Sequence, residues 1–470
     1  MCRFVSSKHT DQNKKNSINY FYHDLKLQMV KLINVIVMTA LFGFTWYQSY
    51  SQTIYYPFYR VGNWVVIALF ILVYYLYGRT YDAFVISLSS ISDKVYSQIL
   101  AIIFSDGIMY ATILLLTRHI PRILPLLLCL IAQAVFALIW SFLAYHWYFR
   151  EFSPSDTVIV YDDDPDLGKM DSMIKQYSLD NKFEVKETYQ VLEVINNLEL
   201  LSSYDAVFLA NVHSHSRNQL MKYCINQNIQ VYILPRIGDV IMSGADRIHM
   251  LHLPVMHLSR YNPRPEFVFL KRLFDLVASL ALFIITSPIL IIIALIIKFF
   301  DNGPVFYKQV RLTKDEREFK LIKFRSMRVD AEKDGVARLS TGENDDRITP
   351  IGKFLRKVRL DELPQLINII KGDMSIVGPR PERPEIAKEY EETLPEFSLR
   401  LQAKAGLTGY AQVYGKYNTT PYNKLEMDLM YISNPSLLED LRIIFATIKI
   451  LFQSESTEGI EEGEETAQKK

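Results

Sequence analysis

The chain has 470 residues, enough for two or three domains, and half of them are hydrophobic, which excludes a disordered or fibrous protein. Its 52 basic and 51 acidic residues leave a net charge of +1, so no charge excess favours a nucleic-acid partner. The three cysteines are too scattered for a metal site or a disulfide framework, which favours a reducing compartment or a membrane.

Four apolar segments precede residue 150, and each is about long enough to cross a hydrocarbon core of ~30 Å. They cover residues 32–48, 62–78, 98–117 and 123–146. Because the leader at 1–31 is basic, we expect a cytoplasmic amino terminus and a four-helix transmembrane domain at 32–150. Asp106 lies inside the third segment, where a carboxylate is either a functional group or a helix-packing group.

A fifth apolar run, at residues 273–300, is interrupted at its centre by Ser287 and Pro288. Each half has about 14 residues, roughly 20 Å of helix, which is too short to cross the membrane alone. Basic residues flank both ends, so both ends should stay in the cytoplasm. We therefore expect a helix, a break and a second helix that together enter one leaflet and return. The alternative is a single kinked span.

Residues 151–262 are typical of an α/β domain. Apolar runs at 157–161, 206–209 and 230–234 predict buried strands of a parallel sheet. A dinucleotide site needs a glycine-rich turn after the first strand, but the sequence at 162–165 is DDDP. Three carboxylates would repel a pyrophosphate. We therefore expect a Rossmann-like domain without a bound dinucleotide, serving regulation or dimer contact.

The catalytic candidates lie in the next part, at residues 263–453, and are followed by an acidic tail at 454–470 that should be disordered. Asp361 and Glu362 are adjacent and stand shortly before Pro364, a residue that suits the first turn of a helix. We expect a helix to begin near Asp361, which is then either a simple cap or a nucleophile. The two carboxylates also suit Mg²⁺, which takes one or two of them together with substrate phosphates.

Positive side chains accompany this carboxylate pair. Arg356 precedes it, and Arg380 is held between two prolines. Lys323 and Arg325 share one face if their segment is a strand. An anionic nucleophile, a divalent cation and several fixed positive groups are the parts that phosphoryl transfer needs.

With these motifs the chain resembles the bacterial sugar transferases, the polyprenyl-phosphate sugar-1-phosphate transferases of exopolysaccharide and O-antigen assembly. The likeness rests on motifs that follow one another in order: KRLFD (271–275), the Ser287–Pro288 break, GPVFY (303–307), KFRSM (323–327), LDELPQ (360–365), VGPRP (377–381) and GLTGYAQV (406–413). Four preceding spans and a Rossmann-like insert resemble the large form of this family.

The resemblance implies a membrane protein of the α + α/β class, with four transmembrane helices, a Rossmann-like domain, a re-entrant helix and a mainly helical catalytic domain. It would transfer a sugar-1-phosphate from a UDP-sugar to undecaprenyl phosphate and release UMP, on the cytoplasmic face of the bacterial inner membrane. A homodimer is also expected.

The resemblance also implies roles for single residues. Asp361 would be the nucleophile that takes the phosphosugar covalently, and Glu362 would help to hold Mg²⁺. The residues that would bind phosphate or substrate are Arg356, Arg380, Gln412 near the nucleotide or sugar, and Asp428 as a further acidic candidate.

Two other functions stay open at this point. A glycosyltransferase that moves the sugar without its phosphate would release UDP and needs a metal-binding Asp-x-Asp, for which residues 162–164 are a weak candidate. A non-catalytic assembly or chain-length regulator would carry long coiled-coil heptads, which the sequence does not contain.

Overall fold

The computed structural model describes residues 2–59, 61–87, 89–117, 119–162, 181–250, 252–261, 263–301, 303–328, 347–415 and 420–451. Two compact units divide the chain, Met1–Pro235 and Arg236–Lys470, and each is described by itself. Most of the acidic turn, at 163–165, and the acidic tail at 454–470 lie outside the described residues.

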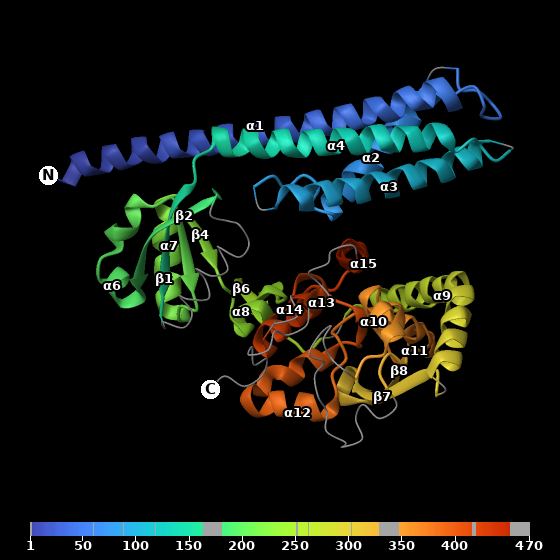
Figure 1. Ribbon diagram of the computed structural model, residues 1–470. Coiled ribbons are helices and arrows are strands. Elements are labelled where there is room, and N and C mark those ends of the chain that lie inside the picture. The colour runs from blue at the N-terminus through green and yellow to red at the C-terminus, as the bar shows by residue number, and fades with distance from the viewer. Residues whose placement is uncertain are drawn as a thin grey trace. The chain divides into compact units, whose positions relative to one another are not determined.

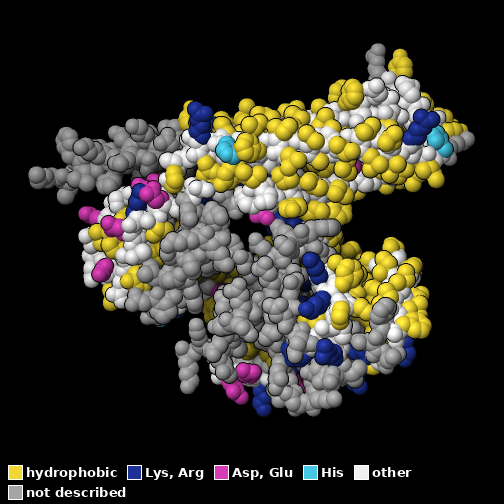
Figure 2. Space-filling view, in the orientation of Figure 1, with side chains coloured by type: hydrophobic (Ala, Val, Ile, Leu, Met, Phe, Trp, Pro, Cys, Tyr) yellow, Lys and Arg dark blue, Asp and Glu magenta, His cyan; other side chains and the backbone are white. Residues whose placement is uncertain are grey.

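Long apolar helices open the first unit (Figure 1). They are α1 (Cys2–Thr45), the π-helical turn η1 (Trp46–Tyr50), α2 (Val61–Thr80), α3 (Ile91–Leu116) and α4 (Leu124–Glu151). The candidate spans Tyr22–Tyr50, Val61–Thr80, Ile91–Leu116 and Leu124–Glu151 are each long and apolar enough to cross a membrane. The four predicted segments fall on these spans, but the first span begins at Tyr22 rather than 32, the third at Ile91 rather than 98, and the fourth ends at Glu151 rather than 146. The basic leader is helical as well, so α1 begins well before its apolar part. Hydrophobic side chains cover the outside of these helices in Figure 2.

Polar side chains lie inside this helical bundle and bond to one another. The Tyr74 hydroxyl donates to Asn34 at 2.8 Å, and the Asn34 amide donates to Gln98 at 3.4 Å. Asp106 is only 2% exposed, so it too faces neighbouring helices rather than the apolar outer surface. Buried hydrogen bonds of this kind fix how apolar helices pack against each other.

A parallel sheet with short helices completes the first unit. Its elements are β1 (Ser155–Tyr161), β2 (Phe183–Gln190), α6 (Val191–Asn196), η3 (Leu198–Ser203), β3 (Ala206–Ala210), α7 (Ser214–Asn226) and β4 (Gln230–Ile233). The four strands are parallel in the order β2-β1-β3-β4. The three predicted strands are confirmed. The second strand, β2, was missed because its sequence is charged and mostly exposed, as suits a strand at the edge of a sheet.

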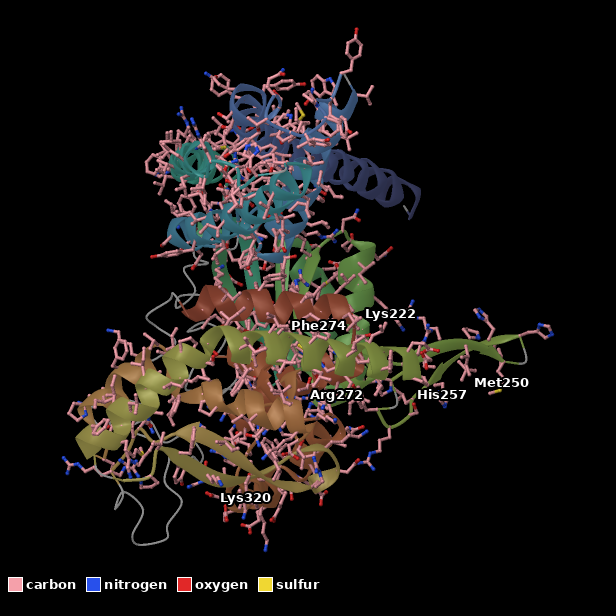
Figure 3. All side chains as sticks on the ribbon, turned by 90° about the vertical axis from the view of Figure 1, so that its right-hand side faces the viewer. Lys222, Met250, His257, Arg272, Phe274 and Lys320 are labelled. Carbon is pink, nitrogen blue, oxygen red and sulfur yellow. The ribbon has the colours of Figure 1, made fainter. Side chains whose placement is uncertain are left out.

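The second unit begins earlier than the sequence suggested. The first helix after residue 235, α8 (Ile237–Ser243), packs with the C-terminal core through the buried Val240, so the stretch up to residue 262 belongs with this unit and not with the α/β domain. A hairpin of β5 (Asp246–Met250) and β6 (Leu253–His257) follows and extends away from α9 in Figure 3, where Met250 and His257 are labelled.

The remaining elements form the body of the second unit. They are α9 (Pro265–Asp301), β7 (Phe306–Leu312), η4 (Lys314–Glu316), β8 (Glu318–Phe324), α10 (Pro350–Lys357), η6 (Leu360–Gln365), α11 (Leu366–Lys371), β9 (Ser375–Val377), α12 (Pro384–Thr393), η7 (Pro395–Gln402), β10 (Gly406–Thr408), α13 (Tyr410–Tyr414), α14 (Pro421–Ser433) and α15 (Leu437–Leu451). β7 and β8 form an antiparallel hairpin, and β9 pairs in parallel with β10.

Helix α9 continues through Pro288, where the sequence predicted a break. It bends sharply instead (Figure 1). Bending lets the helix accommodate the proline, and the hydroxyls of Thr286 and Ser287 donate to carbonyls one turn back, at 2.7 and 2.8 Å. Both arms pack on the same unit. Phe283 in the first arm contacts the core around Ile369, and Ile297 in the second is buried with Phe324 and its neighbours.

Charged residues near the start of α9 bond this helix to neighbouring elements of the second unit. Arg272, labelled in Figure 3, donates to the carbonyls of Ile369 and Ile370 at 2.7 and 2.8 Å and thereby caps the C-terminal end of α11. Lys271 forms an ion pair at 2.7 Å with the buried carboxylate of Asp440. The KRLFD motif therefore joins the membrane-type helix to the elements that carry the site.

Candidate active site

Asp361 and Glu362 lie in the 3₁₀ helix η6, which continues directly into α11. Arg359 precedes them with a left-handed backbone (φ 53°), which turns the chain sharply out of α10. The expected helix start is therefore present, although its first turn is 3₁₀ rather than α. Asp361 is 8% exposed, so its carboxylate sits against the protein rather than in open solvent.

The side chain of Asn368 fastens α11 to strand β8. Its Oδ1 accepts the backbone N–H of Ile322 at 3.0 Å, and its Nδ2 donates to the carbonyl of Lys320 at 2.9 Å. This docking brings the next strand residue, Lys323, to the carboxylates: its Nζ lies 4.0 Å from Glu362 Oε1. Residues that are about 40 positions apart in sequence thus become neighbours.

Arg380 reaches the pair from a third segment, where Nη2 lies 3.3 Å from Glu362 Oε1. The backbone before it makes a very close contact, because a Cβ on Gly378 would stand 2.2 Å from the carbonyl oxygen of Lys404. Only glycine allows β9 to approach the loop before β10 so closely. The VGPRP motif is therefore a rigid support from which one guanidinium extends.

Burial and charge separate the behaviour of the two carboxylates. Burial opposes ionisation of Glu362, but the charges of Arg380, Lys323 and Arg359 outweigh it and lower its pKa to about 2. Burial and then the neighbouring Glu362 raise the pKa of Asp361 to about 6. Burial also lowers the pKa of Lys323 to about 8, although Glu362 opposes this shift. Strongly shifted groups gathered in one place are typical of catalytic sites.

The other predicted residues occupy different surroundings. Arg356 is among the charges that lower the pKa of Asp361, and its Nε donates to the Ser326 hydroxyl at 3.0 Å. Arg325 is buried at the end of β8, where its guanidinium lies against Gly303, so close that a Cβ there would stand 1.8 Å from Nη1.

Gln412 and Asp428 also differ in their placement. The amide nitrogen and oxygen of Gln412 are buried and have no hydrogen-bond partner among the described residues, which leaves them available to a ligand. Asp428 is 1% exposed and forms an ion pair with Arg400 at 2.7 Å. The structure therefore places Asp428 away from any surface that a substrate could reach.

A small pocket opens beside Glu362. Its lining comprises Arg311, Leu321, Lys323, Glu362, Gln365, Arg380, Pro381, Gly406 and Leu407. Among these, Arg311 was not among the residues that the sequence singled out. Its distinguishing property, burial that lowers its pKa to about 10, has no sequence signal.

Two adjacent carboxylates, Asp361 and Glu362, are the candidate protein ligands for a Mg²⁺ ion that would take its other ligands from a substrate. Within the described ranges, no group of three or more His, Cys, Asp or Glu side chains is placed to hold a metal ion. Asp361 and Glu362 are close enough for Glu362 to raise the pKa of its neighbour. Mg²⁺ commonly takes two such carboxylates and completes its shell with phosphate oxygens and water.

Comparison with known proteins gives a consistent result for the second unit. The family model for bacterial sugar transferases matches residues 267–454. The exopolysaccharide production protein PSS of Rhizobium leguminosarum bv. phaseoli is 42% identical over 188 residues, which are 38% of this chain and 93% of that protein.

Two larger relatives match over longer stretches of this chain. A UDP-N-acetylgalactosamine-undecaprenyl-phosphate N-acetylgalactosaminephosphotransferase of Aeromonas hydrophila is 36% identical over 231 residues, 48% of this chain and 53% of its own. The UDP-glucose:undecaprenyl-phosphate glucose-1-phosphate transferase of Escherichia coli K12 is 37% identical over 212 residues, 44% of each. The matched part thus spans about half the length of these relatives. With nearly the whole Rhizobium protein covered, this chain belongs to the bacterial sugar transferase family.

Proposed function

We propose that the second unit transfers a sugar-1-phosphate from a UDP-sugar to undecaprenyl phosphate and releases UMP, with Asp361 as the nucleophile. The observation that carries the proposal is the meeting of Asp361 and Glu362 with Lys323, Arg356 and Arg380, charged groups from separate segments around one buried carboxylate. Relatives whose names state this type of reaction support it.

The reaction would proceed in two balanced steps at one phosphorus atom. A carboxylate oxygen of Asp361 attacks the phosphorus that carries the sugar, and the bond from this phosphorus to the bridging oxygen breaks, so that UMP leaves. An acyl phosphate then links Asp361 to the sugar phosphate. A phosphate oxygen of the lipid attacks the same phosphorus, which returns the carboxylate and yields the lipid diphosphate sugar.

The surrounding charges would stabilise the phosphoryl group as it moves. Lys323 and Arg380 stand beside Glu362 at the edge of the pocket and can contact phosphate oxygens, since Arg380 is 44% exposed. When bound by Asp361 and Glu362, Mg²⁺ would neutralise negative charge on the diphosphate. Positioning and electrostatic stabilisation supply most of the catalysis in phosphoryl transfer.

In this proposal α9 enters the membrane as a re-entrant helix. Both arms pack on the same unit, which favours a helix that enters the membrane and returns over one that crosses it. Its outer surface is apolar, with residues such as Ile285 and Phe299 more than 70% exposed, and Figure 2 shows hydrophobic side chains over it beside Lys and Arg side chains. A shallow helix next to basic groups would hold the site at the cytoplasmic headgroup region.

The first unit would serve as an anchor and accessory module. We propose that α1 to α4 span the bacterial inner membrane with both ends of the bundle's chain in the cytoplasm, as the basic leader favours. The parallel sheet would be a Rossmann-like module for regulation or for contact in a homodimer, and it takes no part in the reaction proposed here.

One product assay tests the proposed reaction. Membranes containing the full chain are incubated with undecaprenyl phosphate and a panel of UDP-sugars labelled in the sugar, and nucleotide products are separated. We expect UMP, a labelled lipid and a labelled protein adduct that is absent from Asp361→Asn. Release of UDP would favour a glycosyltransferase, and an active Asp361→Asn variant would contradict the nucleophile assignment.

Reporter fusions test the membrane arrangement separately. Fusions after residue 150 and after residue 301 should both report the cytoplasm. Opposite locations would show that α9 spans the bilayer and would contradict the re-entrant proposal without bearing on the chemistry.

A further inference from the structure

We propose that Arg400, held by Asp428, is a positioning residue that fixes Arg380 against Glu362. This inference deepens the proposed function and rests on it. It also gives Asp428, which the sequence placed among the substrate-binding candidates, a role that needs no contact with substrate.

The Arg400–Asp428 pair is buried and has good geometry. Arg400 is 2% exposed and Asp428 is 1% exposed. The Nε and Nη2 atoms of Arg400 lie 2.8 and 2.7 Å from the same carboxylate oxygen, Asp428 Oδ2. The guanidinium also lies over the ring of Phe397, 4.8 Å from its centre. A guanidinium fixed in this way has little freedom to move.

The guanidinium of Arg400 also binds the backbone of the VGPRP motif, which carries Arg380. Its Nη2 donates to the carbonyl of Arg380 at 2.8 Å. The flanking carbonyls are held as well: Pro379 accepts from the N–H of Gly406 at 2.8 Å, and Pro381 accepts from Arg311 at 2.9 Å. Three consecutive carbonyls are thus each fixed by a donor from a different element.

Glu382 completes this arrangement between the two guanidiniums. Its two carboxylate oxygens lie 3.6 Å from Arg311 and 3.7 Å from Arg400. Buried charges cost free energy unless they are paired and hydrogen-bonded. Two arginines, two carboxylates and the backbone carbonyls pair with one another here, although Asp428 Oδ1 has no hydrogen-bond partner among the described residues. This pairing favours a single arrangement of the VGPRP motif.

This fixed backbone determines where the Arg380 guanidinium can stand. The two prolines restrict the backbone on either side, so a shift of the Arg380 carbonyl moves the whole side chain. Arg380 Nη2 lies 3.3 Å from Glu362 Oε1, and this contact weakens quickly with distance. A displacement of about 1 Å can cost on the order of a hundredfold in rate.

The conservative variant Arg400→Lys tests the inference. Lysine keeps the charge, but a single ammonium cannot serve Asp428 and the Arg380 carbonyl in the geometry of the fork. We expect kcat for UMP release to fall about tenfold or more, with a smaller change in KM for the UDP-sugar. Arg442→Lys, a change in an exposed ion pair with Glu439, is the matched control and should behave as the wild type.

A double-mutant cycle separates positioning from general stabilisation. If Arg400 acts through Arg380, Arg400→Lys should have little further effect in an Arg380→Lys background, whereas independent effects would multiply. Asp428→Asn keeps the shape of the pair and enters the same cycle if Arg400→Lys does not fold. Multiplying effects, or a kcat in folded Arg400→Lys that equals the wild-type value, would overturn the inference.

The outcome also distinguishes this inference from the proposed function. Wild type and Asp361→Asn are assayed alongside. No UMP release by the wild type, or equal release by Asp361→Asn, contradicts the function itself. An active wild type, an inactive Asp361→Asn and a fully active Arg400→Lys contradict only the positioning role.

Discussion

The charge on Lys323 should set the alkaline limit of activity. Burial lowers the pKa of this ammonium from 10.5 to about 8; Glu362 and Asp361 oppose the shift, whereas Arg380 and Arg311 add to it. A group with this pKa is about nine-tenths charged at about pH 7 and about one-tenth charged at about pH 9. If the charged form is needed, the rate of UMP release should fall about tenfold over this interval.

Replacing Lys323 by arginine tests the cause of this fall. Arginine stays protonated throughout this range, so Lys323→Arg should lose the alkaline limb even if its greater length lowers the maximal rate. Lys323→Gln removes the charge at every pH. Because Lys323 lowers the pKa of Asp361, the glutamine variant should also move the acid limb, where Asp361 becomes protonated, to a pH above about 6. Lys320→Arg, an exposed change on the same strand, is the control.

The assay is the initial rate of UMP release by the full chain in membranes or detergent, with both substrates saturating and with rates taken across both limbs. Only the shape of each profile is compared, so a lower maximal rate does not affect the conclusion. A wild-type rate that stays constant well above pH 8, or an arginine variant whose alkaline limb coincides with that of the wild type, would refute the reasoning.

Three further changes test other parts of the structure. The folded-state pKa of Asp361, about 6, exceeds its ordinary 3.8, so its ionisation costs stability as the pH rises. Asp361→Asn should thus raise the free energy of unfolding by up to about 3 kcal/mol above about pH 6, and hardly at all below about pH 4. Thermal unfolding measures this, and an equal effect in the two pH ranges would contradict the prediction. Asn368→Leu leaves the buried N–H of Ile322 and carbonyl of Lys320 without their partner and should lower that free energy by about 2–4 kcal/mol; a loss well below 1 kcal/mol would argue against the docking role. Chelation of Mg²⁺ should stop UMP release and its return should restore it, whereas metal-independent turnover would exclude the proposed ion.

Local patterns predicted the helices and buried strands because each is determined by its own composition. The apolar runs located the four long helices α1 to α4, although not all of their ends, and the runs at 157–161, 206–209 and 230–234 correspond to β1, β3 and β4. The edge strand β2 escaped because FEVKETYQ carries three charged residues and exposes most of its side chains. Its strand state depends on pairing with β1, which no local pattern records.

The site was predictable in its members and not in its arrangement. Motif content singled out Asp361, Glu362 and Arg380, but their meeting depends on Asn368 joining α11 to β8 and on Gly378 allowing a close backbone approach. Those contacts are between segments far apart in sequence. The ion pair between Arg400 and Asp428 also joins residues that are separated in sequence. The sequence therefore did not show that Asp428 is buried against Arg400, and it placed Asp428 among the candidate substrate ligands.

The structure also explains why the two adjacent carboxylates need not be equivalent. Lys323 and Arg380 both contact Glu362 directly, and their charges stabilise its ionised form to well below neutral pH. Asp361 is buried beside that negative charge and keeps a raised pKa. A carboxylate that binds protons more tightly is also the better nucleophile toward phosphorus, provided that it is ionised at the working pH. Two neighbouring groups whose surroundings move their pKa values apart are thereby assigned different tasks. The charges that hold Glu362 ionised therefore leave Asp361 as the more reactive of the two.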